Sequence, residues 1–177
     1  MIFIPRRAYR VPARGAPPMR AVRSVGGRQY GLPMAYDFQV TIDSTDPHVL
    51  ADWWADALGW EVEPSDEAFI LKMVEQGQAS QDDTTTHRGA LVWKAGAAIR
   101  HPDGIDRAPR VLFQLVPEPK TVKNRVHLDV RIGTDGIDAV AERLTAEGAT
   151  LLHHGKQGPY TWVTLADPEG NELCVSQ

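Results

Sequence analysis

The chain has 177 residues, of which 42% are hydrophobic and 24% are charged, a balance typical of a globular protein with one core. No apolar run approaches the roughly 20 residues that a membrane helix needs. The single cysteine, Cys174, excludes an internal disulfide. We therefore expect a cytoplasmic protein that has no membrane partner.

Charge is unevenly distributed along the chain, although the formal net charge is only −4. Residues 1–33 hold seven of the 19 basic residues and no acidic residue, so residues 34–177 keep 12 basic against 23 acidic residues, a net of −11. The Arg- and Pro-rich segment has no periodicity and no apolar signal-peptide core, which predicts disorder. It is either an arm for a polyanion or the product of a mis-assigned start, because Met34 directly precedes the first patterned segment. The acidic body has no basic surface to extend such an arm, so we expect no nucleic-acid partner.

The first patterned segment, residues 36–43, alternates apolar and polar side chains, which predicts a half-buried strand. Asp46 as N-cap and Pro47 at the first helical position then predict a helix. The Trp53–Trp54 pair lies on its apolar stripe, and Gly59 is placed to end it. We expect this pair to pack in the core rather than to bind a ligand.

The following residues have weaker patterns. Residues 60–63 and 68–74 are interpreted as strands, residues 86–98 as a short helix, and residues 109–116 as a strand. His87 is expected to be a solvated side chain.

The second half of the chain repeats the first. A strand at residues 125–132 precedes a helix that begins near Asp135, and further strands are expected at residues 149–154, 161–166 and 171–177. His127 follows Gln39 by 88 residues and Gly148 follows Gly59 by 89, so the two units agree in spacing to within one residue. This agreement indicates an internal duplication.

The duplication predicts an α+β fold made of two tandem βαβββ modules, residues 36–117 and 124–177, in one domain that spans residues 34–177. Helices should cover the apolar outer faces of the two sheets. The sheets should then form a half-open barrel with an internal cleft. Four polar residues at alternating strand positions are predicted to face that cleft: Gln39, Gln114, His127 and Cys174.

With this pattern and with the segments VPEPKTVKNRVHLDV (116–130) and DPEGNELCV (167–175), the sequence resembles the glyoxalase/bleomycin-resistance/dioxygenase superfamily, the vicinal oxygen chelate proteins, over about residues 36–177. The resemblance implies four metal ligands from the first and last strands of each module, typically two His or Gln and two Glu. The equivalent positions here are Gln39, Gln114, His127 and Cys174.

Two of these positions depart from the superfamily, because Gln114 and Cys174 stand where it usually has glutamate. Amide oxygens are weak ligands compared with carboxylates, and a thiolate favours a soft metal. Asp129 and Glu172 lie on the same strand faces, but a slip of two residues moves a group by about 6.6 Å. We therefore expect no cofactor, with a divalent metal in a rearranged site as the alternative.

Two functions follow from the resemblance. The first is a protein that binds a small molecule in its cleft, as a lyase- or isomerase-type enzyme with a degenerate metal site, in which the catalytic residues would be His127, Asp129 and Glu172. The alternative is metal-independent binding or drug sequestration, as in bleomycin-resistance proteins. An acidic body and several aromatic residues suit an aromatic or cationic guest: Trp60, Trp93, Trp162 and Tyr160. Many relatives form homodimers, which we also count among the expected partners.

The same residues have structural explanations. His127 could be a buried histidine that is hydrogen-bonded to Asp129 or Gln39, and Gln114 could pair with Gln39. Cys174 could be a small buried hydrophobic residue. The sequence leaves these alternatives open.

Overall fold

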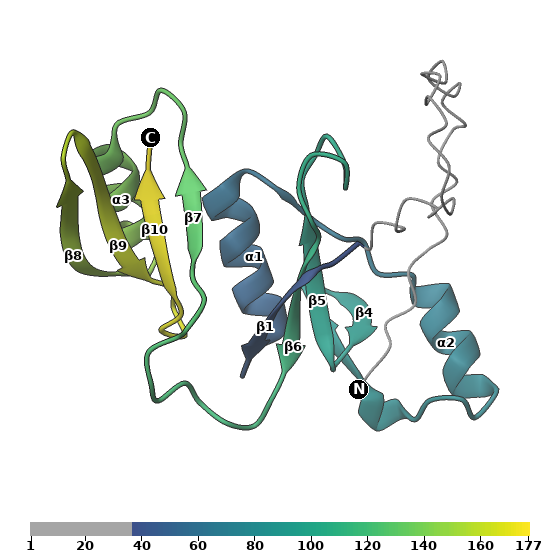
Figure 1. Cartoon of the computed structure of the whole chain (residues 1–177). Helices are drawn as coiled ribbons and strands as arrows, with labels where there is room; N and C mark the ends of the chain where they lie inside the picture. Colours follow the sequence, from purple (N-terminus) through teal and green to yellow (C-terminus); the bar gives the residue numbers. More distant parts are fainter. Residues whose placement is uncertain (1–36) are drawn as a thin grey trace, which may run out of the picture. The chain divides into compact units, whose positions relative to one another are not determined.

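A computed structural model describes residues 37–177 (Figure 1), and every structural statement below concerns these residues. The predictions made for residues 1–33 and for Met34 lie outside the described part of the chain. Phe38–Gln177 form one compact unit. Within it, no helix combines the length and the apolar character needed to cross a membrane.

The first module is a four-stranded sheet in the order β1-β6-β5-β2, with helix α1 packed on one face. Strand β1 runs parallel to β6, and the other pairs are antiparallel. Its elements are β1 (Val40–Ser44), α1 (Pro47–Leu58), β2 (Glu61–Val62), β5 (Gly96–Arg100) and β6 (Val111–Leu115).

The second module has the same topology, with β7 next to β10, β10 next to β9, and β9 next to β8. Figure 1 shows these strands side by side, with α3 across one face of their sheet. Its elements are β7 (Leu128–Arg131), α3 (Ile137–Ala146), β8 (Thr150–Gln157), β9 (Tyr160–Ala166) and β10 (Glu172–Ser176). In each module the first strand pairs with the last in parallel, which confirms the predicted α+β fold of two βαβββ units.

Helix α1 begins and ends where the sequence predicts. The Asp46 side chain accepts a hydrogen bond from the Val49 N–H, Pro47 occupies the first turn, and Gly59 adopts the left-handed conformation with φ 65°. A side chain at φ near +60° costs about 1 kcal/mol or more, which favours glycine at this position.

The hydrophobic core continues from one module into the other through α1. Trp53 and Trp54 are buried, as predicted, with 8% and 1% of their surfaces exposed. Their indole N–H groups donate hydrogen bonds to the second module, from Trp53 to the Glu147 carbonyl and from Trp54 to the Asp167 carboxylate, both at 3.0 Å. Each indole thus buries a large apolar surface while its polar atom stays satisfied.

Two predictions in the first module are wrong. Residues 68–74 form helix α2 (Glu67–Glu75) rather than a strand. The Asp66 side chain caps this helix through the Phe69 N–H, and Ile70, Met73 and Val74 cover its inner side at helical spacing. A short 3-10 helix at Gln81–Asp83 follows it.

The second wrong prediction is the helix at residues 86–98. This stretch contains the hairpin of β3 (Thr84–His87) and β4 (Ala90–Trp93), followed by the start of β5. The hairpin turn places both Arg88 and Gly89 at positive φ, 49° and 82°. Two central residues with positive φ form the tight hairpin turn whose twist matches that of the flanking strands. Gly89 was the sequence signal for this turn, but it lay inside the segment that was predicted as a helix.

Glu169 fastens the second module to the start of α1. Its carboxylate accepts hydrogen bonds from the Ser44 hydroxyl at 2.7 Å and from the N–H groups of Thr45 and Asp46 at 2.8 and 3.0 Å. Burial alone raises the pKa of this carboxyl, but these hydrogen bonds outweigh it and hold the pKa below its ordinary value.

We predict that Glu169→Gln destabilises the protein by about 1–2 kcal/mol at pH 7, because it removes charge-assisted hydrogen bonds. A carboxyl whose pKa is lowered in the folded state stabilises the protein above its unfolded-state pKa, and that contribution is lost as pH falls through the folded-state pKa. The difference from wild type in urea unfolding should therefore shrink in acid. The surface variant Glu142→Gln is the control, and an equal effect of the two substitutions would contradict this role of Glu169.

Candidate functional site

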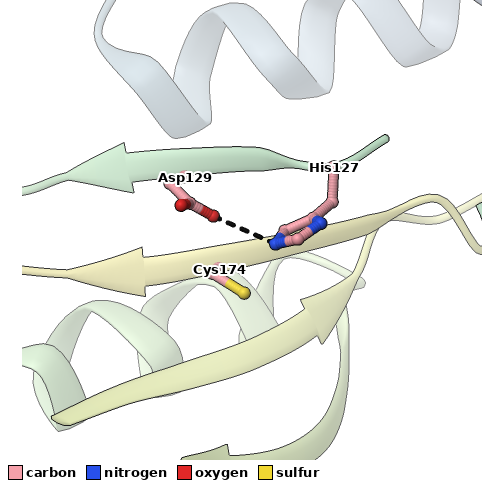
Figure 2. Close-up of side chains that lie close together, drawn as sticks. All are labelled: His127, Asp129 and Cys174. Atoms are coloured by element: carbon pink, nitrogen blue, oxygen red, sulfur yellow. Dashed lines mark ion pairs between the residues drawn. The ribbon is translucent and has the colours of Figure 1, made fainter. Parts of the chain in front are cut away.

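The described residues bring His127, Asp129 and Cys174 together (Figure 2). Asp129 lies on β7 and Cys174 directly opposite on β10, while His127 immediately precedes β7. One ligand-type atom from each side chain lies within 4.8 Å of the others. The His127 Nε2 and Asp129 Oδ1 atoms are 3.2 Å apart. The side chains of His127 and Asp129 are 43% and 61% exposed, and the Cys174 thiol is more covered. His127 is therefore not a buried histidine, which was the structural explanation that the sequence left open.

A polar row crosses the second sheet from this group to its far edge. The strand register places Asp129 opposite Cys174, Cys174 opposite Thr164, and Thr164 opposite His153. The Thr164 hydroxyl lies 3.4 Å from the Cys174 thiol and 3.2 Å from His153 Nε2. The neighbours of Thr164 on its own strand, Val163 and Leu165, point to the core. The row therefore lies on the face opposite α3, which we call the open face of the second sheet.

A cleft of about 430 Å³ adjoins His127. Thr41 and Asp43 line it from β1. Lys120 lines it from residues 116–127, the connector between the two modules, and Glu169 lines it from the turn before β10. Charged groups of both signs and several neutral donors thus meet a volume sufficient for a small molecule.

Glu172 contributes no free base to this region. Its carboxylate accepts hydrogen bonds from Lys120 Nζ and from the Asn124 N–H, both at 3.1 Å. Burial raises the pKa of Glu172, but these two donors outweigh it and keep the pKa below its ordinary value. Glu172 therefore fixes the connector between the modules, and the predicted catalytic role is left to His127 and Asp129.

Gln39 is held by charged neighbours in the first module. Its amide oxygen accepts a hydrogen bond from Arg110 Nη1 at 2.9 Å, and the same guanidinium donates from Nε to both oxygens of Glu63 at 2.9 Å. The amide nitrogen lies 3.5 Å from the Thr41 hydroxyl. Gln39 therefore pairs with Arg110 and not with Gln114.

Gln114 does not lie beside Gln39 on the sheet, as the resemblance to the superfamily implied. It faces Asp43, whereas Gln39 lies beside Arg110, four residues earlier on the partner strand. Four residues of a strand span about 13 Å. In the second module, Cys174 lies opposite Asp129 on the neighbouring strand. Thr41 is the equivalent of Asp129 in the first module, and the residue opposite it is the apolar Leu112. The structure brings His127 and Cys174 together but does not bring Gln39 and Gln114 together.

Thr164 and His153 are site residues that the sequence analysis missed. The signal for Thr164 in the sequence was a polar residue between the apolar Val163 and Leu165, and the structure buries it, with 4% of its surface exposed. His153 follows an irregularity in β8 between Leu151 and His153, which shifts the register and hides the alternation. His87 was also misjudged, since its ring lies half-buried with Nε2 2.7 Å from Asp52.

The group of His127, Asp129 and Cys174 fits a divalent metal ion of intermediate softness. Zinc accepts nitrogen, oxygen and sulfur at about 2.0–2.3 Å, and three protein ligands leave a fourth position open. Ligand atoms of such a tetrahedron lie about 3.3–3.8 Å apart, close to the 3.2 Å between His127 and Asp129. The three side chains thus offer a nitrogen, an oxygen and a sulfur ligand within 4.8 Å of one another.

Several solved structures share this fold at low sequence identity. A glyoxalase/bleomycin resistance protein/dioxygenase family enzyme from Burkholderia phytofirmans PsJN is 14% identical with a TM-score of 0.51, covering 78% of this chain and 94% of that one. A mutant of the fosfomycin resistance protein FosX from Listeria monocytogenes, complexed with Mn(II) and 1S,2S-dihydroxypropylphosphonic acid, is 9% identical with a TM-score of 0.54, covering 81% and 92%. The oxidase ChaP-H2 is 15% identical with a TM-score of 0.51, covering 81% and 94%. A search of curated proteins found no match.

The paired βαβββ modules and these structural neighbours share one fold, that of glyoxalase-like proteins. The family model for the glyoxalase-like domain matches residues 39–176, and the chain belongs to this family.

We predict that Lys120→Met raises the pKa of Glu172 toward its ordinary value, because the variant loses a donor and a nearby positive charge. Carboxyl NMR titration of the two proteins measures the change. Lys123→Met is the matched control, since the Lys123 side chain is 63% exposed and its ammonium lies 3.9 Å from the same carboxylate. An unchanged pKa in Lys120→Met would show that Glu172 does not depend on Lys120.

Proposed function

We propose that the protein binds a small oxygenated molecule in the cleft beside His127, at a centre where His127, Asp129 and Cys174 hold a divalent metal ion. The observation that carries this proposal is the convergence of the three side chains within 4.8 Å. When bound, such an ion polarises a substrate oxygen as a Lewis acid.

The chain's own groups suit proton transfer of the lyase or isomerase type. Asp129 orients the His127 ring through the contact at 3.2 Å. Lys120 and Asn124 line the cleft and can orient an oxygen of the substrate. The structural neighbour FosX was solved in complex with Mn(II), and a metal-assisted reaction comes to this chain only by analogy of fold.

A second candidate function is metal-independent binding of a small molecule. The side chains of the first module favour it, because the Gln39 amide oxygen is hydrogen-bonded to Arg110 and the residue opposite Thr41 is the apolar Leu112. No metal-ligand group is then completed from this side among residues 37–177. Binding would rest on shape and hydrogen bonds in the cleft.

We predict that the wild-type protein binds one Co²⁺ ion with a thiolate-to-metal absorption band, because Cys174 would be a ligand. Cys174→Ser should abolish the band, and His127→Ala should weaken the affinity about tenfold or more. Titration followed by absorbance measures both effects.

His154→Ala is the control for this titration, because His154 faces Val163 and lies outside the polar row. It should leave the band and the affinity unchanged. Failure of the wild-type protein to bind Co²⁺, together with binding of small molecules in the presence of a chelator, would reject the metal centre in favour of the second candidate.

A further inference from the structure

Two apolar side chains stand exposed at the cleft beside His127. Val122 and Val126 have 75% and 76% of their surfaces exposed, more than any other large hydrophobic residue among residues 37–177. Both line the cleft from the connector. Single exposed apolar residues are ordinary on protein surfaces, whereas two of them at the rim of one cleft indicate a surface that a bound molecule covers.

Hydrogen bonds hold the connector in place on both sides of Val122. Before it, Lys120 Nζ donates to the Glu172 carboxylate at 3.1 Å. After it, the Asn124 N–H donates to the same carboxylate at 3.1 Å, and the Asn124 side-chain amide donates to Asn171 Oδ1 at 3.2 Å. These bonds tie the connector to β10 and to the turn before it. The apolar rim is therefore positioned before a ligand binds, which lowers the cost of binding.

The rest of the apolar wall of the cleft is aliphatic. It comes from β1, from the start of the connector and from β7: Val40, Ile42, Val116 and Leu128. Trp54 also lines the cleft, but only 1% of its surface is exposed. Aliphatic side chains contribute apolar area and dispersion contacts without a flat ring for stacking. Such a wall suits a saturated hydrocarbon chain.

The charged groups of the cleft disfavour an anionic ligand. Four carboxylates line it against one ammonium group, that of Lys120: Asp43, Glu118, Glu169 and Glu172. The positive charge of Lys120 is offset by its ion pair with Glu172. An anionic head group would meet this excess of negative charge. An uncharged hydroxyl group, by contrast, can donate a hydrogen bond to a carboxylate.

We propose that Val122 and Val126 form a subsite for the aliphatic chain of an uncharged, hydroxylated ligand whose oxygen atoms lie beside His127. This inference deepens the proposed function by naming the class of ligand, and it rests on that function for the binding of the oxygenated group. The chain contributes affinity through the apolar area that it buries with the two valines, and the hydroxyl groups set the orientation.

The experiment compares two vicinal diols that differ only in chain length, propane-1,2-diol and hexane-1,2-diol. Each methylene group that is fully buried strengthens binding about fourfold, and the open rim covers the chain in part. NMR titration of the wild-type protein should therefore show saturable binding of hexane-1,2-diol about tenfold tighter than that of propane-1,2-diol. Hexanoate, which carries an anionic head group, should bind about tenfold more weakly than hexane-1,2-diol.

Serine variants separate the subsite from folding. Because both valines are exposed, the double variant Val122→Ser, Val126→Ser should unfold in urea as wild type does. It should bind hexane-1,2-diol about tenfold more weakly, or about 1.4 kcal/mol, and propane-1,2-diol within about twofold of wild type. Val49→Ser is the matched control, since Val49 is 54% exposed on α1 and does not line the cleft.

The outcomes are distinct from those for the metal centre. Equal affinity of the wild type for the two diols, or the same preference for the longer diol in the double variant, would overturn the subsite. A wild-type dimer in light scattering that the double variant lacks, with unchanged diol binding, would also overturn it, because the valines would then cover a second copy of the chain.

If the wild-type protein binds Co²⁺ without preferring the longer diol, the subsite is rejected and the proposed function stands. A preference for hexane-1,2-diol that persists in His127→Ala and is lost in the double valine variant supports the subsite even where the metal centre fails.

Discussion

The interaction on which the structure depends is the attachment of the 167–170 turn to helix α1. Asp167 accepts a hydrogen bond from the Trp54 indole N–H, and Glu169 accepts from the N–H groups of Thr45 and Asp46, the two residues directly before the same helix. A carboxylate beside the N-terminus of a helix is also stabilised by the helix dipole. One turn of the second module thus fixes the start of the first module's helix and places Glu169 in the wall of the cleft.

The duplication was readable from the sequence because it repeats simple signals, an alternating strand, a helix and a glycine. Asp46, Pro47 and Gly59 marked α1 correctly. The prediction for the segment between β2 and β5 was wrong, because short amphipathic stretches of similar composition can form either helices or strands. Two local features decide the outcome here: the helix cap at Asp66 and the pair of residues with positive φ at the hairpin turn. Such features act through local geometry that periodicity does not record.

The site was harder to predict than the fold, since it depends on register. His127 and Asp129 are two residues apart, and their proximity follows from strand alternation alone. Gln39 and Gln114 share a face, yet four residues of register separate them, and only the pairing of β1 with β6 shows this. The roles of Arg110 and Lys120 depend on long-range contacts, with sequence separations of 71 and 52 residues, which no local pattern contains.

The two modules share one topology but have diverged in what their open faces carry. In the first, an Arg–Glu pair immobilises the amide of Gln39 directly before β1; in the second, His127 and Asp129 are exposed beside the more covered Cys174. A chain built from equivalent halves therefore carries one candidate centre rather than two. Under the proposed function, this asymmetry means that the ion saturates at one equivalent per polypeptide, without cooperativity between the halves.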